Sequence, residues 1–380
     1  MKVLKFSIPE IFFGRGSLAY AGMCARNLGA RKVFFVSDPG LAAAGWVEKV
    51  EEILKQEGLE WFYYGNVVPN PRDTHIEAGT ERYHDEGCDV VMALGGGSPM
   101  DTAKGIALLS SNGGKVRDYE GANRIQRALP PMVFIPSTAG GGSDVSQFAI
   151  ITDVQRMVKM SLISRTLVPN ISIVDPLLLT TNSQALIIES AVDALAHAVE
   201  SYLSKIAFSL TTGHSLKAIR LIFQNLPIAL ETGSLDALEE LSIASTSAGM
   251  AFSNASLGLE HALAHSLGGM LDTVHGRIHP VLLPPVMRYN LPCCIEKLAN
   301  IGEIVLGGRK KTERDTALAG IERFEALFET LNISTRLRDI VEARDTLPQI
   351  CQRALHDACL LSTPREVALD EMLDICEKAW

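Results

Sequence analysis

Acidic and imidazole side chains gathered between residues 193 and 275 could bind a divalent metal ion. The segment A-V-D-A-L-A-H-A-V-E at 191–200 is rich in Ala and lacks Gly and Pro, which predicts a helix. Asp193 and His197 are four residues apart and therefore share one helical face. His261 and His265 repeat this spacing, and His275 follows ten residues later. One carboxylate and several imidazoles from separate segments suit Fe(II), Zn(II), Mn(II), Ni(II) or Co(II).

Other interpretations of these residues remain open. An acid and a histidine four apart can be a buried or a solvated polar pair, and a lone core histidine usually has a structural role. However, four of the nine histidines fall between residues 261 and 279, in a largely apolar stretch where a charged imidazole would be costly. This clustering favours a metal site. Asp plus three His would leave a coordination position open for a substrate, as catalytic sites require.

A glycine-rich segment has features of a phosphate-binding loop. D-V-V-M-A-L at 89–94 predicts a buried strand, and G-G-G-S-P-M-D follows directly. Ser98 is a natural N-cap, Pro99 fits the first helical position, and Asp101 completes a capping-box spacing. Free N–H groups at the start of this helix would favour an anion such as a pyrophosphate, although a plain tight turn is the alternative. The spacing is not G-x-G-x-x-G, which excludes an ordinary Rossmann fingerprint.

Four further residues could contact a nucleotide. Asp38 ends the strand-like run at 32–38, where it could accept hydrogen bonds from an adenosine ribose and repel a 2′-phosphate, or simply cap the following turn. Asn70 lies between two prolines, which alone indicates only a turn. Thr138 follows a strand in a hydroxyl- and glycine-rich loop. Lys159, in a strand-like segment, could lie near the ribose or nicotinamide, or in solvent.

The organisation of the chain changes after Asp175 and Pro176. Before this point, strand patterns alternate with helical ones, and the last strands are predicted at 148–153, 157–164 and 171–176. Beyond it, the chain is rich in Ala and Leu with helical periodicity. We therefore predict an α/β dinucleotide-binding domain over 1–178 and an all-helical metal-binding domain over 179–380.

Composition excludes several classes of protein. A 380-residue chain with 47% hydrophobic residues is typical of globular domains. The net charge, 35 − 44 = −9, argues against a general nucleic-acid or anionic-membrane surface. No uncharged apolar run reaches about 18 residues, and no signal peptide is apparent, so we expect a cytoplasmic protein outside the membrane. Seven cysteines without a C-x-x-C motif are expected to be reduced, and most of them to pack in the interior.

Taken together, four motifs resemble the iron-containing (group III) alcohol dehydrogenases. They are G-G-G-S-P-M-D at 95–101, P-S-T-A-G-G-G-S-D at 136–144, D-A-L-A-H-A-V-E at 193–200 and H-A-L-A-H-S-L-G-G-x5-H-G at 261–276. The match spans nearly the whole chain. It implies the dehydroquinate synthase-like architecture of this family, in which an α/β N-terminal domain precedes an all-α C-terminal domain and the active site lies between them.

The resemblance also implies an activity and a set of roles. The expected enzyme is a metal-dependent, NAD(H)-linked alcohol dehydrogenase or aldehyde reductase for small primary alcohols or aldehydes, with Fe(II) as the expected metal. The family likeness suggests a homodimer or larger homo-oligomer. His265 would line the site as a proton carrier without binding metal. The implied metal ligands are Asp193, His197, His261 and His275. The implied nucleotide contacts are Asp38, Asn70, Gly95, Gly96, Gly97, Ser98, Thr138 and Lys159. Asp101 of the glycine-rich loop is a further candidate for contact with the nucleotide.

The chain departs from the family pattern at three positions. Gly141 stands where a Thr is common, which removes a hydroxyl near the cofactor. His279 replaces the usual Asn and could extend a proton path as a catalytic residue, alter the metal preference, or pack. Glu260 stands where an apolar residue is usual, and could point away from the metal or support a ligand.

Two alternatives to an alcohol dehydrogenase remain open. One is a related enzyme on the same scaffold, similar to a glycerol dehydrogenase, a maleylacetate reductase or a lyase. The other is a nucleotide or metal sensor without turnover, which the Gly141 and His279 departures would favour. The sequence leaves open the native metal, the chain length of the substrate and the physiological direction.

Overall fold

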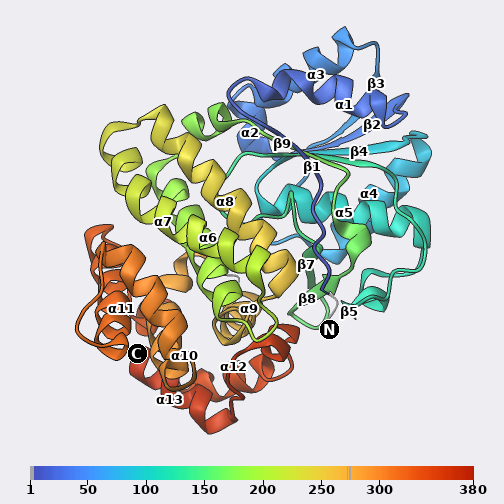
Figure 1. Ribbon diagram of the computed structural model, residues 1–380. Coiled ribbons are helices and arrows are strands. Elements are labelled where there is room, and N and C mark those ends of the chain that lie inside the picture. The colour runs from blue at the N-terminus through green and yellow to red at the C-terminus, as the bar shows by residue number, and fades with distance from the viewer. Residues whose placement is uncertain (1–3, 272, 274) are drawn as a thin grey trace. The chain divides into compact units, whose positions relative to one another are not determined.

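The computed structural model describes residues 4–271, 273 and 275–380, which form two compact units. The unit containing the sheets, called the sheet unit below, comprises residues 7–183 and 233–242. The helical unit comprises the described residues of the remaining segments, 1–6, 184–232 and 243–380. The predicted boundary at 178 lies within a 3-10 helix, Pro176–Thr181, near the end of the sheet unit. Figure 1 labels the elements of both units.

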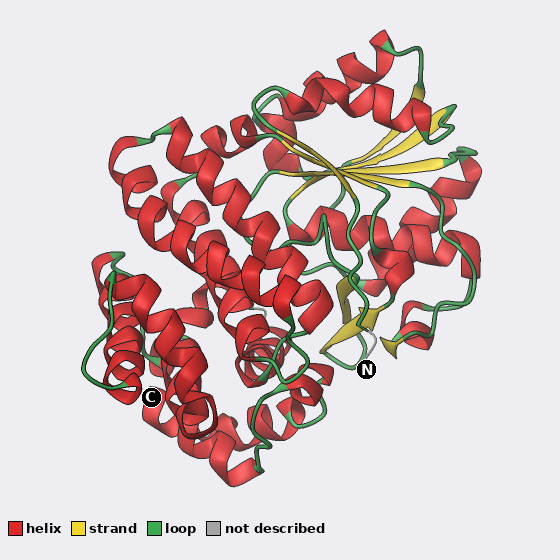
Figure 2. Ribbon diagram, viewed as in Figure 1, coloured by secondary structure: helices red, strands yellow, loops and turns green. Residues whose placement is uncertain are grey.

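A six-stranded parallel sheet forms the centre of the sheet unit (Figure 2). The strands are short and almost entirely apolar, as expected when helices cover both faces of a parallel sheet. In spatial order the strands are β1 (Glu10–Phe13), β9 (Ile171–Val174), β6 (Met132–Pro136), β4 (Val90–Gly95), β2 (Lys32–Val36) and β3 (Glu60–Tyr64).

Alternate side chains of each strand enter two separate cores. Phe34 lies in a core with α4 (Asp73–Asp85) and α5 (Gly97–Asn112). Phe35, the next residue, lies in a second core with α1 (Ala21–Asn27) and α3 (Trp46–Gln56). This alternation follows from the period of two along a strand, and it fixes which helices cover each face.

A smaller, three-stranded sheet packs against α5 through its strand β7. Its strands, in order, are β5 (Gly121–Ala122), β8 (Val158–Ile163) and β7 (Phe148–Asp153). Fully buried Lys104 of α5 donates from Nζ to the carbonyl oxygens of Ser146 (2.9 Å) and Phe148 (2.6 Å). These hydrogen bonds satisfy a buried ammonium group, which would otherwise be costly, and fasten α5 to β7.

The helical unit is organised around α10, which packs against α6, α7, α9, α11 and α13. The helix is kinked at Cys294, whose backbone angles are not helical, two residues after Pro292. The helices that follow residue 183 in the chain are α6 (Gln184–Leu203), α7 (Ser209–Thr232), α8 (Leu235–Ala255), α9 (Leu259–Leu271), α10 (His279–Leu306), α11 (Glu313–Thr330), α12 (Leu347–Ala354) and α13 (Leu369–Ala379). The first residues of α8 belong to the sheet unit.

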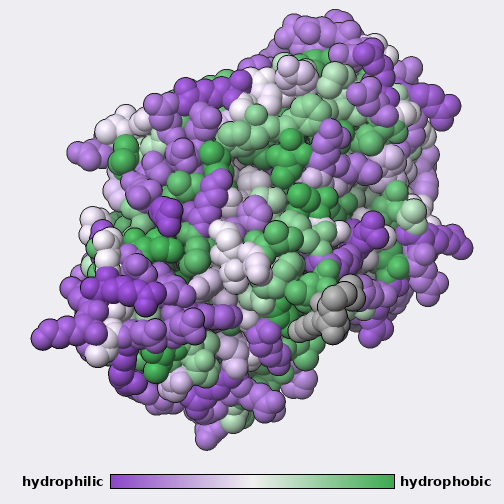
Figure 3. Space-filling model, viewed as in Figure 1, coloured by the Kyte–Doolittle hydropathy of each residue, from purple (hydrophilic) through white to green (hydrophobic). Residues whose placement is uncertain are grey.

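These elements confirm the predicted fold class, an α/β N-terminal part followed by helices. The predicted strand at 148–153 matches β7, whereas the one at 171–176 ends earlier, at Val174, because Pro176 begins a 3-10 helix. Among the described residues, no helix is both long and apolar enough to cross a membrane. Hydrophilic residues cover much of the visible face, with hydrophobic ones between them (Figure 3).

Candidate functional site

Four side chains from four elements of the helical unit converge on one point. Asp193 comes from α6, His261 from α9, His275 from a short 3-10 helix (His275–Arg277), and His279 is the first residue of α10. Each offers one possible ligand atom, and these atoms all lie within 4.8 Å of one another. The predicted ligands Asp193, His261 and His275 are therefore brought together, and His279 joins them.

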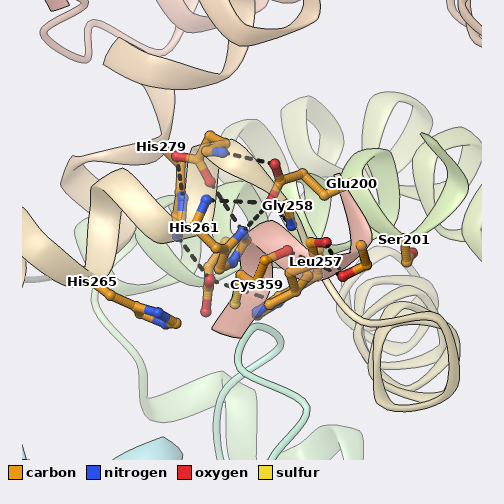
Figure 4. A network of polar contacts seen from close by, with 12 residues as sticks. Glu200, Ser201, Leu257, Gly258, His261, His265, His279 and Cys359 are labelled. Carbon is orange, nitrogen blue, oxygen red and sulfur yellow. Dashed lines mark hydrogen bonds and ion pairs between the residues drawn. The ribbon is translucent and has the colours of Figure 1, made fainter. Parts of the chain in front are cut away.

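Glu200, which the sequence analysis did not single out, positions His261. One turn after His197 on α6, its carboxylate accepts hydrogen bonds from the backbone N–H groups of Gly258 (2.9 Å), Glu260 (2.8 Å) and His261 (3.2 Å). The same carboxylate accepts from Nδ1 of His261 at 2.8 Å (Figure 4). Glu200 thereby satisfies the free N–H groups at the start of α9 and fixes the orientation of the His261 ring.

Glu260 contacts two of the imidazoles. Its Oε1 accepts a hydrogen bond from Nδ1 of His279 at 2.9 Å, and its Oε2 lies 3.1 Å from Nδ1 of His261. The other nitrogen of His279, Nε2, lies 2.9 Å from Oδ1 of Asp193. Of the two interpretations left open for Glu260, the geometry therefore favours support of the imidazoles.

The donor atoms fit a divalent cation. Nε2 of His261 is buried and has no hydrogen-bond partner among the described residues. A buried, unpaired ring nitrogen is costly, and a metal ion would satisfy it. Because Nδ1 of this ring is held by Glu200, Nε2 is the nitrogen left for a ligand bond, which is the usual arrangement of a metal-binding histidine. Imidazole and carboxylate together suit iron or zinc.

His197 lies beside this group but is oriented differently. Its Nδ1 is 3.6 Å from Oδ1 of Asp193, and its ring stacks on Phe252 and His261 with centroid distances of 4.3 Å and 4.6 Å. Burial, together with the neighbouring His261 and His279, lowers the pKa of His197 to about 3. The ring is therefore neutral, as a metal ligand must be, and its role as a ligand stays a prediction.

The buried carboxylates shift the pKa values of their partners strongly. Burial alone would lower the pKa of His261, but the contacts with Glu200 and Glu260 outweigh it and raise this pKa to about 10. Burial is likewise outweighed at His279, where Glu260 and Asp193 raise the pKa to about 9. Burial would raise the pKa of Glu260, yet the two imidazoles lower it to about 2. In the absence of a metal ion, imidazolium charges therefore neutralise the carboxylates.

Another acidic residue, far away in the sequence, holds His265. Oδ2 of Asp357 accepts a hydrogen bond from Nδ1 of His265 at 2.8 Å, and its Oδ1 accepts from the backbone N–H of Cys359 at 2.8 Å. The His265 ring stacks on His275 with a centroid distance of 5.3 Å. His265 is thus next to the converging group without belonging to it, which agrees with the role that the resemblance implies.

Replacing Asp357 with Asn should destabilise the protein in a pH-dependent way. Burial raises the pKa of Asp357, but the charge and hydrogen bond of His265 outweigh it and lower this pKa to about 2 from the ordinary 3.8. A lowered carboxyl pKa stabilises the fold above pH 3.8 and loses this effect as the pH falls toward 2, so at neutral pH it is worth roughly 2 kcal/mol. Urea unfolding from pH 3 to 7 should show a flatter profile for the variant; parallel profiles would contradict this.

Part of the predicted nucleotide site lies at one edge of the main sheet, namely Asp38, Thr138 and the 95–98 loop. The carboxyl ends of β2, β4 and β6 are neighbours. Ser37, which follows β2, donates a hydrogen bond from Oγ to the carbonyl oxygen of Leu94 in β4 (2.9 Å), and Ser137, which follows β6, donates from its backbone N–H to the carbonyl oxygen of Gly95 in β4 (2.9 Å). An added Cβ at Gly96 would lie 3.3 Å from the side chain of Thr138. The structure therefore brings Asp38, Thr138 and the 95–98 loop to the edge where parallel sheets bind ligands.

The predicted capping by Ser98 is wrong. Helix α5 begins at Gly97, its N-cap is Gly96, and no side chain caps it. Asp101 does not turn back to the N-cap; it accepts hydrogen bonds from Oγ of Ser143 (2.6 Å) and the N–H of Ile150 (3.0 Å). Because Gly96 lacks a side chain, the first N–H groups of this long helix are left for an anion. A nucleotide contact by Asp101 stays a prediction.

The local environments of Asp38, Asn70 and Lys159 differ from one another. Asp38 is the N-cap of α2 (Pro39–Ala43) and accepts a hydrogen bond from the N–H of Leu41 at 3.1 Å, as its turn-capping interpretation predicts. Asn70 adopts a left-handed backbone conformation, with φ of 56°. Lys159 lies on β8; burial raises the pKa of Asp101, and the ammonium charge of Lys159 opposes this rise. Contacts of these three residues with a nucleotide stay predictions.

Comparisons with known proteins agree with the predicted family. Residues 9–176 match the family model for iron-containing alcohol dehydrogenase, and residues 187–380 match that for the C-terminal part of the Fe-containing alcohol dehydrogenase family. The chain is 37% identical to a 1,3-propanediol dehydrogenase of Klebsiella pneumoniae, over 100% of this chain and 99% of that protein. It is 33% identical to an NAD-dependent methanol dehydrogenase of Bacillus methanolicus, over 98% and 99% respectively.

A solved structure agrees with these matches. The crystal structure of a 1,3-propanediol oxidoreductase superposes with a TM-score of 0.96 at 37% identity and covers 100% of both chains. The relatives that span nearly the whole chain are named as alcohol dehydrogenases and as a lactaldehyde reductase, in agreement with the expected alcohol dehydrogenase or aldehyde reductase activity. The family models and the full-length relatives together show that the chain belongs to the iron-containing alcohol dehydrogenase family.

Proposed function

We propose that this protein is a metal-dependent, NAD(H)-linked dehydrogenase of small primary alcohols that also reduces the corresponding aldehydes. The observation that carries the proposal is the convergence of Asp193, His261, His275 and His279 within 4.8 Å of one another. The relatives named for propanediol and methanol support small primary alcohols as the substrate class. A cytoplasmic location, expected from the sequence, and a homo-oligomeric state, implied by the family resemblance, stay predictions.

The side chains around this point have separate tasks. Asp193 and the converging imidazoles would hold a divalent cation, with Glu200 and Glu260 fixing two of the rings. When bound, such a cation supplies a Lewis acid for the substrate oxygen, and NAD(H) supplies or accepts the hydride. His265, whose Nδ1 is held by Asp357, has Nε2 left to exchange the hydroxyl proton with solvent.

The sheet unit would bind the nucleotide. The uncapped start of α5 would accept the pyrophosphate, and an added Cβ at Gly97 would meet no atom of the described residues within 4 Å, so that a ligand has room there. Asp38 would accept hydrogen bonds from the adenosine ribose. The Bacillus methanolicus relative, which is named as NAD-dependent, supports NAD over NADP.

Replacing Asp38 with Gly should relax the preference for NAD. Removal of the carboxylate would end its repulsion of a 2′-phosphate, and we expect the ratio of kcat/KM for NADP to that for NAD to rise roughly tenfold or more. Asp38→Ser is the matched control, because Ser also caps a helix but carries no charge. Steady-state kinetics with both cofactors should show the rise in both variants; an unchanged ratio would argue against this role for Asp38.

The proposed function is tested by a single assay series. Protein stripped with a chelator is reloaded with Fe(II), Zn(II), Mn(II) or Ni(II) and mixed with NADH and acetaldehyde or butanal, and NADH absorbance is followed. We expect turnover only in reloaded samples, and the reverse reaction with NAD and the alcohol. Nucleotide binding without turnover under any metal would instead favour the sensor, and activity with glycerol or maleylacetate but not with aldehydes would favour a related enzyme.

A further inference from the structure

The pair Glu260 and His279 is built into the centre of the candidate metal site. Both side chains are fully buried. The family resemblance implies an apolar residue and an Asn at these two positions, where this chain has a carboxylate and an imidazole. A buried carboxylate without a partner is strongly destabilising, and an imidazole at hydrogen-bond distance compensates it.

The orientation of His279 is that of a ligand. Its Nδ1 is held at 2.9 Å by Oε1 of Glu260, and this leaves Nε2 directed at the convergence point, 2.9 Å from Oδ1 of Asp193. His261 has the same arrangement, with Nδ1 held by Glu200 at 2.8 Å and Nε2 without a hydrogen bond to the described residues. In metal sites, a carboxylate on one ring nitrogen typically fixes the other nitrogen on the ion.

Ring contacts place His279 within the group of imidazoles. Its ring centroid is 4.9 Å from that of His261 and 4.6 Å from that of His275. Glu260 reaches both sides of this group, since its Oε2 lies 3.1 Å from Nδ1 of His261. One buried carboxylate thus positions two imidazoles at once.

We propose that Nε2 of His279 is a direct ligand of the divalent cation and that Glu260 is the positioning residue that holds this ring. The proposal rests on the proposed function, because it concerns the same metal centre. It gives the chain a ligand that an Asn at this position would not supply in the same way, since an amide is a weaker ligand for Fe(II) or Zn(II) than an imidazole.

The test compares metal binding in the full-length wild type, H279N, E260V, the E260V/H279N double variant and H356N. His356 is an exposed histidine of the helical unit that lies in the turn after α12, and its Nδ1 contacts the carbonyl oxygen of Gln352, so H356N is the matched control. Competition with a chelator gives the dissociation constant for Zn(II) and Co(II), and visible absorption of the Co(II) protein reports its ligand set. Circular dichroism verifies that each variant is folded.

We expect H279N to weaken metal binding by at least about tenfold and to change the Co(II) spectrum, and E260V to weaken it roughly 10- to 100-fold. The double variant should bind about as weakly as H279N, because removal of the ring leaves Glu260 with less to position. H356N should match the wild type. If E260V does not fold, H279N and the double variant, which restores the residue types usual in the family, complete the comparison.

Two results would overturn the proposal in distinguishable ways. If the wild type binds metal and H279N binds it as tightly or more tightly, with the same Co(II) spectrum, His279 is not a ligand and the proposed function is unaffected. If the wild type binds neither Zn(II) nor Co(II), both the ligand assignment and the metal-dependent function fail.

Discussion

Replacing His261 with Ala is expected to abolish metal binding and turnover together. Nε2 of His261 is a buried ring nitrogen without a hydrogen bond to the described residues, and Nδ1 of the same ring is already held by Glu200. The loss of this ligand removes the Lewis acid, whose effect on the transition state is worth several kcal/mol. We therefore expect kcat/KM to fall by roughly a thousandfold or more.

The experiment measures bound metal per chain by atomic emission and kcat/KM with NADH and butanal in the same preparations. His356→Ala is the matched control, because that side chain is exposed on the same unit. The control should retain both metal and activity. A His261→Ala protein that keeps wild-type metal content and turnover would refute the role of His261 as a ligand.

Replacing Glu200 with Gln should have the second large effect, on stability as well as on metal affinity. The carboxylate accepts hydrogen bonds from three backbone N–H groups at the start of α9 and from Nδ1 of His261. An amide has one acceptor oxygen, so buried donors would lose their partners. We expect a loss of roughly 3–5 kcal/mol in the free energy of unfolding and a roughly 10- to 100-fold weaker metal affinity.

Urea unfolding of metal-free protein and chelator competition measure these two effects separately. Glu189→Gln is the control, because Glu189 lies on the same helix and pairs with Arg277, whose side chain is 64% exposed. Such exposed pairs contribute at most about 1 kcal/mol. If Glu200→Gln were no more destabilising than this control, Glu200 would not hold the start of α9 as the structure indicates.

The pattern of hydrophobic residues is sufficient to predict the helices and strands that carry the site, because the periodicity of a helix or strand is a local property of the sequence. The runs at 89–94 and 148–153 are strands, and the Ala-rich segment at 191–200 lies within a helix. The start of α5 was misplaced, because capping depends on the backbone conformation of the loop and not only on a Ser before a Pro. In the structure Gly96 takes the capping position, and Ser98 lies within the first turn.

The partners of the histidines were harder to predict, because they come from distant parts of the chain. His279 was recognised as unusual, but its contact with Glu260 crosses 19 positions and requires the start of α10 to lie against α9. Asp357 holds His265 across 92 positions and follows no periodic pattern. Glu200 left one signal, because it is, like Asp193, an acidic residue in a largely apolar helical stretch.

Anomalous X-ray scattering from a crystal of the protein grown with Co(II) tests most directly whether Asp193, His261 and His275 bind one cation. The account predicts one strong peak per chain, about 2.0–2.2 Å from Nε2 of His261 and in contact with Asp193 and His275. A peak held instead by His265, Asp357 and Cys359, the other nearby group of possible ligands, would contradict it. So would a fully loaded crystal without a peak between Asp193 and His261.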